Sequence, residues 1–527
     1  MKFKFPFLFG AFCLSAFLLS ASVAAAPYIP LAQECDGYPQ LPVGTVDNLC
    51  VGLLVQKSTS VAFKMPRTAV EMPDGKLLVV DMGGWVENKG KLWLVDYRAK
   101  NITAVALLSN LNFPHKILRG RDGKYYLGEA QRIIRFDINK GSVVQQETVV
   151  DGLPYHDDYL HPLKNFVFDN NNNLIINTGS TSDHCEKTVS IADCSHGVEA
   201  GLRQYNFDKT TNTWNKNFTV IASGLRNSMA LAVDTSGTLL QAENSIDFPS
   251  ADEPYEEINL IEPGGFYGWP LCYDRNASVD DIKSACGEKN YREPWSLMPP
   301  HVAPLDALYY HHTKLPMLNN KLLMTWHGYK IVGHRLVAFD VDEQGRPIRA
   351  NTATYNSDPL KAGDDFKKKS FSAKSGVGLV AQHREIISRW NEIAGLRPKG
   401  GPTGMSVMND GSLLIVDDKN SAILRLSTGT AYKDVQSQIE IKTQAVELPE
   451  NIRAIFVNRC SKCHEPLQNN PDQLLSANQW LQKTNGKTRL EQKLFFDKVM
   501  PMPPDKSILP DELKSLKTWI NNLDRPH

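Results

Sequence analysis

The chain has 527 residues, a length that points to more than one domain, and 42% of them are hydrophobic, as in an ordinary globular protein. The 58 basic residues balance 58 acidic ones, so the formal net charge is zero. This balance excludes the one-sided charge with which proteins bind nucleic acid or a membrane surface, and we expect neither as a partner.

The start of the chain has the pattern of a secretory signal peptide. Two lysines precede an apolar run from Phe5 to Leu19, and small residues follow at 22–26. The run is too short and wrongly flanked for a membrane span. We therefore expect residues 1–26 to be a signal peptide, and the mature protein to be a soluble protein of the bacterial periplasm.

Six of the nine cysteines lie in three pairs that are close in sequence. An exported protein can keep such pairs oxidised, and buried free thiols are the alternative. The predicted disulfide bonds are Cys35–Cys50, Cys185–Cys194 and Cys272–Cys286.

One sequence pattern recurs six times between Phe63 and Leu426. It consists of a turn of Asp, Asn and Gly followed by a short apolar strand. Such turns need Gly or Asn because the backbone reaches a positive φ there, and β-branched or aromatic residues suit the strands. The period of about 60 residues exceeds the 40–50 that are typical of propeller blades, so insertions are implied. The copies begin at Pro73, Arg121, Asn171, Ser236, Asn319 and Asn409.

The repeat predicts a mainly β protein with a six-bladed β-propeller. A β-sandwich or a pair of barrels is the alternative, but neither repeats one phrase six times with long loops at the same place. In a propeller these loops meet at one end of the central channel, where a planar cofactor can bind. The expected organisation is an N-terminal extension at 27–62, the propeller at 63–430, a polar linker at 431–446 and a small all-α domain at 447–527.

The last 80 or so residues have the features of a cytochrome c domain. Ile452, Ile455 and Phe456 recur at helical spacing, and a second helix is expected to begin at Pro510. The two helices would pack on each other. The apolar face of the second consists of Leu513, Leu516, Trp519, Ile520 and Leu523.

Between these helices lies the motif Cys460-Ser461-Lys462-Cys463-His464. Two thiols at this spacing can hold haem c by two thioether bonds, and the adjacent His464 supplies an axial ligand of the iron. A redox dithiol or half of a zinc site is the alternative, but neither needs that histidine. Met502, followed by two prolines, is the predicted second axial ligand, and Met500 is its rival.

The region from Phe63 to Ser427 resembles the soluble sugar dehydrogenases that use pyrroloquinoline quinone (PQQ), a family of glucose, aldose and sorbosone dehydrogenase-like propellers. The strongest motif is 224–231, which is similar to the family's Gly-Leu-Arg-Asn-Pro segment. Further matches are the Gly-Gly-Phe-Tyr-Gly-Trp-Pro of 264–270, the Pro-His-Val-Ala-Pro-Leu of 300–305 and the Trp-His-Gly-Tyr-Lys of 326–330.

The resemblance implies roles for several residues at the channel. His161 matches the catalytic histidine, which removes a hydroxyl proton as hydride leaves the substrate. Arg226, with Asn227 beside it, matches the arginine at the quinone oxygens, where negative charge develops. His327 and Lys330 are candidates for further contacts to the cofactor.

The resemblance also implies calcium, a hard cation that takes oxygen ligands. Glu257 and Tyr267 match calcium ligands of the glucose dehydrogenases, and Asn244 and Asp247 resemble an acidic loop of the sorbosone branch. A solvated acidic loop is the alternative for this stretch.

Two positions depart from the family pattern. Ser228 stands where the family has proline. In the last blade the family commonly has an arginine before Pro and Gly, and Gly401 aligns with it. Arg397 or Lys399 is then the candidate for the missing contact to the cofactor.

We therefore expect a periplasmic quinohaemoprotein dehydrogenase that oxidises a sugar, sugar aldehyde or alcohol with PQQ. Electrons would pass to its own haem c, then to a soluble cytochrome or terminal oxidase. The alternative is a propeller without PQQ that serves as a binding or docking module for the cytochrome, as Gly401 and Ser228 favour. A calcium-dependent hydrolase is a third possibility. The presence of His161, Arg226 and Asn227 together argues against both.

Overall fold

The computed structural model describes residues 28–432 and 448–522, apart from 157–158, 186–194, 196, 249–252, 276, 280–289, 329–332, 350–353, 356–370, 373–381, 388–389, 391–399, 461–482, 485–486, 492–493 and 496–507. The expected signal peptide and most of the expected linker lie outside the described residues. No described helix is long and apolar enough to cross a membrane.

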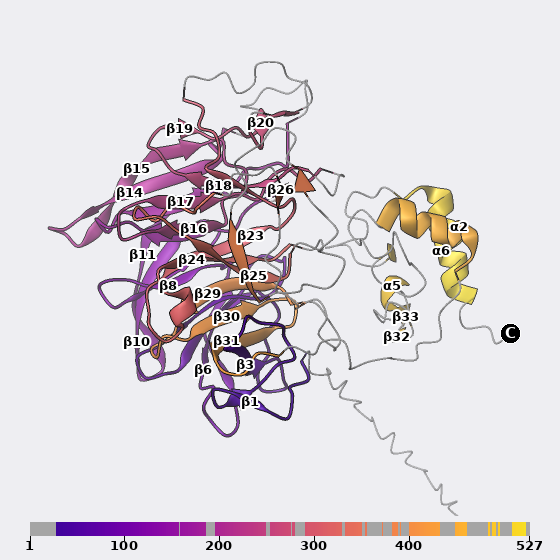
Figure 1. Ribbon diagram of the computed structural model, residues 1–527, viewed down its shortest axis with the longest axis horizontal. Coiled ribbons are helices and arrows are strands. Elements are labelled where there is room, and N and C mark those ends of the chain that lie inside the picture. Colours follow the sequence, from indigo (N-terminus) through magenta and orange to yellow (C-terminus); the bar gives the residue numbers. More distant parts are fainter. Residues whose placement is uncertain are drawn as a thin grey trace, which may run out of the picture.

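Six antiparallel sheets, named blades 1 to 6 in chain order, make up the larger part of the molecule (Figure 1). Blade 1 consists of β4 (Pro66–Glu71), β5 (Leu77–Asp81), β6 (Gly90–Val95) and β7 (Ala104–Leu111). Blade 2 consists of β8 (Ile117–Arg119), β9 (Tyr125–Gly128), β10 (Ile133–Asn139) and β11 (Ser142–Val150). Blade 3 consists of β12 (Phe166–Phe168), β13 (Leu174–Thr178), β14 (Gly201–Asp208) and β15 (Thr213–Ser223), and β19 (Gly265–Phe266) joins its edge.

The other three blades repeat this order, with later segments completing each edge. Blade 4 consists of β16 (Ala230–Val233), β17 (Leu239–Ala242), β18 (Glu256–Leu260) and β22 (Ser296–Met298). Blade 5 consists of β23 (Pro304–Tyr310), β24 (Lys321–Trp326), β25 (Arg335–Asp340) and β28 (His383–Ile387). Blade 6 consists of β29 (Pro402–Val407), β30 (Leu413–Asp417), β31 (Ala422–Thr428) and β3 (Leu49–Gln56).

The first strand of each blade in chain order faces the channel, and β29 of blade 6 contacts β4 of blade 1, which closes the ring. This confirms the predicted six-bladed propeller. Apolar clusters fill the spaces between neighbouring blades. Between blades 1 and 2, for example, Leu78 and Val80 pack with Leu127 and Ile134.

The six turns expected from the repeat all join the first and second strands of a blade, so they lie at one end of the channel. Each turn contains a residue with a positive φ, as the turn chemistry requires. These residues are Gly75, Gly123, Asn172, Gly237, Asn320 and Gly411.

The N-terminal segment completes the last blade. Strand β3 pairs with β31 in an antiparallel register that sets Val51 opposite Leu426. The stretch 27–62, expected as an extension, thus supplies the outer strand of blade 6. The predicted disulfide bond Cys35–Cys50 is present and ties β1 (Glu34–Cys35) to β3.

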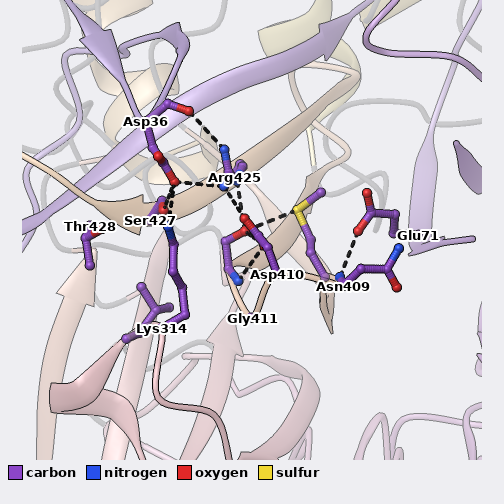
Figure 2. Close-up of polar contacts among 12 residues, drawn as sticks. Asp36, Glu71, Lys314, Asn409, Asp410, Gly411, Arg425, Ser427 and Thr428 are labelled. Atoms are coloured by element: carbon purple, nitrogen blue, oxygen red, sulfur yellow. Dashed lines mark hydrogen bonds and ion pairs between the residues drawn. The ribbon is translucent and has the colours of Figure 1, made fainter. Parts of the chain in front are cut away.

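A polar network fastens the same segment to blade 6. Figure 2 shows Arg425 of β31 between Asp36 and Asp410. The Arg425 Nη2 atom lies 2.8 Å from Asp36 Oδ2, and the Ser427 hydroxyl donates to the same oxygen at 2.5 Å. The closing strand is therefore held by covalent, ionic and backbone contacts together.

The described C-terminal part contains α2 (Glu450–Ile455), which continues as the π-helical turn η5 (Phe456–Cys460), and α6 (Pro510–Asn522). The two helices pack on each other as expected: the rings of Phe456 and Trp519 have centroids 6.0 Å apart, and Arg459 forms an ion pair with Glu512 at 3.0 Å. A separate apolar core surrounds them, built from Leu448, Ile452, Ile455, Phe456, Leu490, Leu516 and Ile520.

Short elements complete the described structure. They are β2 (Tyr38–Pro39), β20 (Cys272–Tyr273), β21 (Ala277–Ser278), η2 (Pro316–Leu318), β26 (Thr354–Tyr355), β27 (Phe371–Ser372), β32 (Lys483–Thr484), β33 (Lys487–Thr488) and α5 (Arg489–Glu491).

Candidate functional site at the channel mouth

Several of the predicted site residues gather at one end of the channel, the end opposite the six turns. We call this end the channel mouth. His161 and Arg226 precede the inner strands β12 and β16, while Asn244 and His327 follow the second strands β17 and β24. A chain that enters an inner strand and one that leaves a second strand are at the same end of a blade. The topology thus brings together residues that are up to 166 positions apart (327 − 161).

His161 is held in one orientation by the loop of blade 3 that follows β13. Its Nδ1 atom lies 2.9 Å from both the Ser180 carbonyl oxygen and the Ser180 hydroxyl. Because a carbonyl oxygen only accepts, Nδ1 carries the proton and Nε2 keeps its lone pair. Gly179 permits this approach, since a Cβ there would lie 2.6 Å from the His161 Cβ.

The electrostatic surroundings keep His161 neutral. Burial lowers the pKa of its imidazole well below 6.5, and the neighbouring Arg226 guanidinium lowers it further. The residue remains half-buried, so its edge is accessible from the mouth. A neutral, oriented imidazole with a free Nε2 lone pair is a competent general base at neutral pH.

Arg226 is buried and held by two acidic loops. Its Nη2 atom lies 2.6 Å from Asp183 Oδ1 and 3.3 Å from Asp247 Oδ2. Its Nη1 donates to the Asn244 carbonyl oxygen at 2.9 Å. These contacts fix the cation beside His161.

Asp183 connects these groups, and sequence reasoning missed it. Its Oδ1 also accepts the backbone N–H of Asp247 at 3.0 Å, and its carbonyl oxygen accepts from Trp269 Nε1 at 2.9 Å. Although burial acts to raise it, the Arg226 charge holds the pKa of Asp183 below its ordinary value. The only sequence signal was its place, a few residues after Gly179-Ser180 in a loop between blade strands.

Asn227 presents an unused acceptor. Its backbone N–H donates to Glu243 Oε1 at 2.8 Å. Its side-chain Oδ1 atom is buried, yet no described group donates a hydrogen bond to it. An orphaned buried acceptor costs free energy in the absence of a ligand, so it marks a place where a donor is expected.

A second polar cluster lies across the mouth, on blades 1, 5 and 6. Asp418, just after β30, accepts from Arg67 Nη1 at 2.6 Å and from His327 Nε2 at 2.9 Å. Burial lowers the pKa of His327, while His327 and Arg67 hold the pKa of Asp418 far below its ordinary value against the effect of burial. Arg67 also donates to His115 Nδ1 at 3.2 Å. Of this cluster, only His327 was predicted.

The four predicted calcium ligands are not gathered into one site. Asn244 and Asp247 lie at Arg226, whereas the Tyr267 hydroxyl donates to the Leu260 carbonyl oxygen at 2.8 Å within an apolar cluster. Glu257 is buried, accepts from Asn259 at 3.2 Å, and has a pKa raised well above 4.5 by burial and by the nearby Glu243. Among the described residues, no group of three or more His, Cys, Asp or Glu side chains could hold a metal ion.

Other predicted residues lie outside the described part of the chain: Lys330, Arg397, Cys463, His464, Met500 and Met502. Cys460 ends η5 and is half-buried against the helical core. Cys185 and Cys272 are disulfide-bonded, and their predicted partners Cys194 and Cys286 lie outside the described residues.

An apolar cluster provides a floor beneath the polar groups of the mouth. Its buried members come from blades 1 to 5 or the loops around them, so the cluster spans most of the ring. They are Met82, Phe113, Ala130, Leu163, Met229 and Leu305.

A large hollow of the described structure lies elsewhere. It has a volume of about 1530 Å³ and is lined by residues such as Asn48, Met317 and Tyr432. Because Met317 belongs to the turn between β23 and β24, this groove is at the end opposite the mouth. It contains none of the polar groups described above, so we place the site by its chemistry rather than by its volume.

Comparison with known proteins agrees with this fold. Residues 121–358 match the family model of "Glucose / Sorbosone dehydrogenase". The PQQ domain of pyranose dehydrogenase from Coprinopsis cinerea is 16% identical, with a TM-score of 0.54 over 75% of this chain and 99% of that one. A carbohydrate-active enzyme of family AA12 from Trichoderma reesei is 19% identical, with a TM-score of 0.52 over 74% and 98%.

No curated protein matches the chain significantly. At these identities the solved structures show the fold alone. The comparisons thus show the β-propeller fold and a likeness of residues 121–358, less than half of the chain, to the glucose and sorbosone dehydrogenases.

Proposed function

We propose that the propeller is a PQQ-dependent dehydrogenase of a sugar, sugar aldehyde or alcohol, and that it passes electrons to a haem c bound by the C-terminal domain. The observation that carries this proposal is the pairing of a neutral His161, oriented through Nδ1, with the fixed cation Arg226 at one channel mouth. The Coprinopsis cinerea structure is the holo form of a PQQ domain, and the propeller shares its fold.

The residues at the mouth fit PQQ, a planar ortho-quinone with three carboxylates. Arg226 would hold its quinone end, because the guanidinium can donate hydrogen bonds to the quinone oxygens. Asn227 Oδ1, the unused acceptor beside it, would take a hydrogen bond from a donor of the cofactor or the substrate. The apolar floor that contains Met229 and Leu305 suits the flat face of an aromatic ring system. When bound, PQQ would supply the hydride acceptor.

The residues of the chain then have defined tasks. His161 Nε2 accepts the proton of the substrate hydroxyl, which favours loss of hydride from the same carbon. Arg226 places positive charge where negative charge develops, and Asp183 with Asp247 keeps it there without reorganisation. Ser180 holds the imidazole, so the lone pair stays aimed at the mouth.

Calcium remains a proposed ligand of the loop with Asn244 and Asp247. A calcium structure of the Trichoderma reesei AA12 enzyme shares the fold, with a TM-score of 0.51 at 18% identity. The four predicted ligands do not fit one ion as they stand, so the roles proposed for His161 and Arg226 do not depend on calcium.

The haem proposal rests on the motif from Cys460 to His464 and on the helical core beside Cys460. Cys460 and Cys463 would form the thioether bonds, while His464 and Met502, or Met500, would be the axial ligands. Haem accepts electrons singly, and the linker would keep it at high effective concentration near the propeller. A soluble cytochrome or an oxidase of the periplasm would take the electrons onward.

The test is the visible spectrum of the purified full-length protein, loaded with calcium and PQQ. Aldoses, sugar aldehydes and alcohols are added in turn. We expect the reduced haem α-band to appear with one class of substrate, and only when PQQ is present. The H161N variant should lose about 100-fold to 10,000-fold in the rate.

The matched control is H311N. His311 is an exposed histidine just after β23, and it lies at the end of the channel that carries the six turns, away from the mouth. If dithionite reduces the haem but no substrate does, and if PQQ does not bind, the result would favour the docking-module alternative.

A further inference from the structure

The loop between β5 and β6 presents a tryptophan to solvent at the channel mouth. It follows the second strand of blade 1, so it lies at the same end of the channel as His161. Two consecutive glycines with a positive φ, Gly83 and Gly84, turn the chain here. A Cβ at Gly83 would lie 2.2 Å from the Lys89 carbonyl oxygen, so the close return of the loop requires glycine. Trp85, which follows this turn, remains 38% exposed.

Aromatic contacts hold the Trp85 ring against the apolar floor of the mouth. The ring centroids of Trp85 and Phe113 are 6.1 Å apart, and those of Phe113 and Tyr155 are also 6.1 Å apart. Phe113 is a buried member of the floor, and Tyr155 packs on the floor. Trp85 therefore extends the floor outward, so that one apolar surface begins in the channel and ends on the rim.

The same row of rings continues to the proposed base. Tyr155 stacks on Tyr159 with centroids 6.5 Å apart, and the Tyr159 hydroxyl donates to the Gly179 carbonyl oxygen at 2.6 Å. Gly179 is the residue on which His161 packs. Leu160, directly before His161, is a further exposed apolar residue of this rim. The row thus follows the mouth from blade 1 to blade 3 and ends beside His161.

Polar groups border the rings on the blade 1 side. The Tyr155 hydroxyl donates to the Glu87 carboxylate, which joins the loop of blade 1 to that of blade 3. Asn88 and Lys89 come next in the loop, and both are exposed. A flat apolar surface with carboxylate, amide and ammonium groups at its border suits a sugar, because the C–H face of a sugar ring stacks on aromatic rings while its hydroxyls form hydrogen bonds.

We propose that Trp85 is the platform of an outer subsite, which binds the sugar ring next to the one that is oxidised. The substrate is then an oligosaccharide rather than a simple alcohol or a single sugar. Two other rings lie between Trp85 and Tyr159 in the row, so a ligand must be longer than one sugar ring to contact both the platform and His161. This inference rests on the proposed function, since His161 marks the place of the reacting hydroxyl.

The first test compares glucose with two disaccharides, cellobiose and maltose, as reductants of the haem in the full-length protein loaded with calcium and PQQ. In W85A the ratio of kcat/KM for the better disaccharide to kcat/KM for glucose should fall about 10-fold, as for the loss of one stacked ring. W85F keeps a ring and should keep most of the preference. F218A is the matched control, because Phe218 of β15 is an aromatic residue of similar exposure, 41%, on the fourth strand of blade 3.

The second test measures binding without the cofactor. The better disaccharide is titrated into the full-length protein without PQQ, and the heat of binding is measured by calorimetry. We expect W85A to bind it about 10-fold more weakly than the wild type, and F218A to bind it as the wild type does. Circular dichroism and thermal unfolding check that each variant is folded.

The outcomes are distinct. If W85A changes kcat/KM for glucose and for the disaccharides by the same factor, or if the wild type binds no disaccharide, Trp85 is not a sugar platform, while the proposed dehydrogenase stands. Slower haem reduction by every substrate at unchanged affinity would also overturn the inference, and would mark the surface as a docking site for the electron acceptor. If the disaccharide binds through Trp85 but no substrate reduces the haem, the sugar subsite stands and the proposed function fails.

Discussion

The Lys116 ammonium lies 2.6 Å from Asp306 Oδ1, and both side chains are buried, with 6% and 2% of their surface exposed. Lys116 precedes β8 of blade 2, and Asp306 belongs to β23 of blade 5, so the ion pair joins opposite blades across the channel axis. Asp306 Oδ2 also accepts the Met405 N–H of blade 6 at 2.8 Å.

The variant K116M should be strongly destabilised, because it leaves Asp306 buried without its cation. We expect the free energy of unfolding to fall by about 3–5 kcal/mol. Guanidinium denaturation measures it. The double variant K116M/D306N keeps an acceptor for Met405 and removes the unpaired charge, so it should recover much of the loss. A K116M protein within about 1 kcal/mol of the wild type would contradict this account.

The pH dependence of activity should follow the lowered pKa of His161. Because the folded pKa lies below 6.5, the base is unprotonated at neutral pH, and activity should fall only when the pH drops through that lower value. The rate of substrate oxidation between pH 4.5 and 8, written as kcat/KM, measures this. A fall in activity centred near the ordinary histidine value of about 6.5 would argue against a buried, neutral base.

The same shift affects stability. Unfolded His161 takes up a proton near its ordinary pKa of about 6.5, whereas folded His161 does not. Protonation therefore favours the unfolded state, and the free energy of unfolding is highest above pH 6.5 and falls as the pH drops below that value. H161N should therefore lose less stability than the wild type between pH 7 and pH 5.5. Denaturation midpoints at these two pH values give the comparison, with the conditions otherwise fixed.

Removal of Asp183 should impair the site without unfolding the propeller. In D183A, Arg226 loses its 2.6 Å ionic partner and the loop loses the anchor for the Asp247 N–H. We expect kcat to fall about 10-fold to 100-fold, while the thermal midpoint falls less than for loss of a fully buried pair, because about a quarter of the Asp183 side chain is exposed and Asp247 remains beside Arg226. D340A, at the exposed end of β25, is the control. Unchanged kinetics of D183A would exclude it as a positioning residue.

The disulfide bond Cys35–Cys50 should stabilise the closing strand of blade 6. The two cysteines are 15 positions apart, and a loop of that length corresponds to about 3 kcal/mol. C35S/C50S should therefore unfold at lower denaturant concentration, as measured by circular dichroism. Reduction of the wild type by dithiothreitol should act in the same direction. An unchanged midpoint would mean that Arg425 and the strand pairing suffice.

The features that were predicted from the sequence depend on residues that are close together in the chain. The contacts that were missed form only when the ring of blades closes. The six turns were found because each contains its own Gly or Asn, and the helix pair because Ile452 and Leu516 keep helical spacing. Asp183 and Asp418 were missed, since their partners Arg226 and Arg67 lie 43 and 351 positions away. Only ring closure brings such residues together.

The seam at β3 and β31 sets Leu49 opposite Thr428. Five blades draw their strands from neighbouring stretches of the chain, but the sixth pairs the first propeller strand to be synthesised, β3, with the last one, β31. Until then β3 has a bare edge, which is an aggregation hazard for a nascent polypeptide. At this seam the propeller strand that is synthesised first therefore waits longest for its partner.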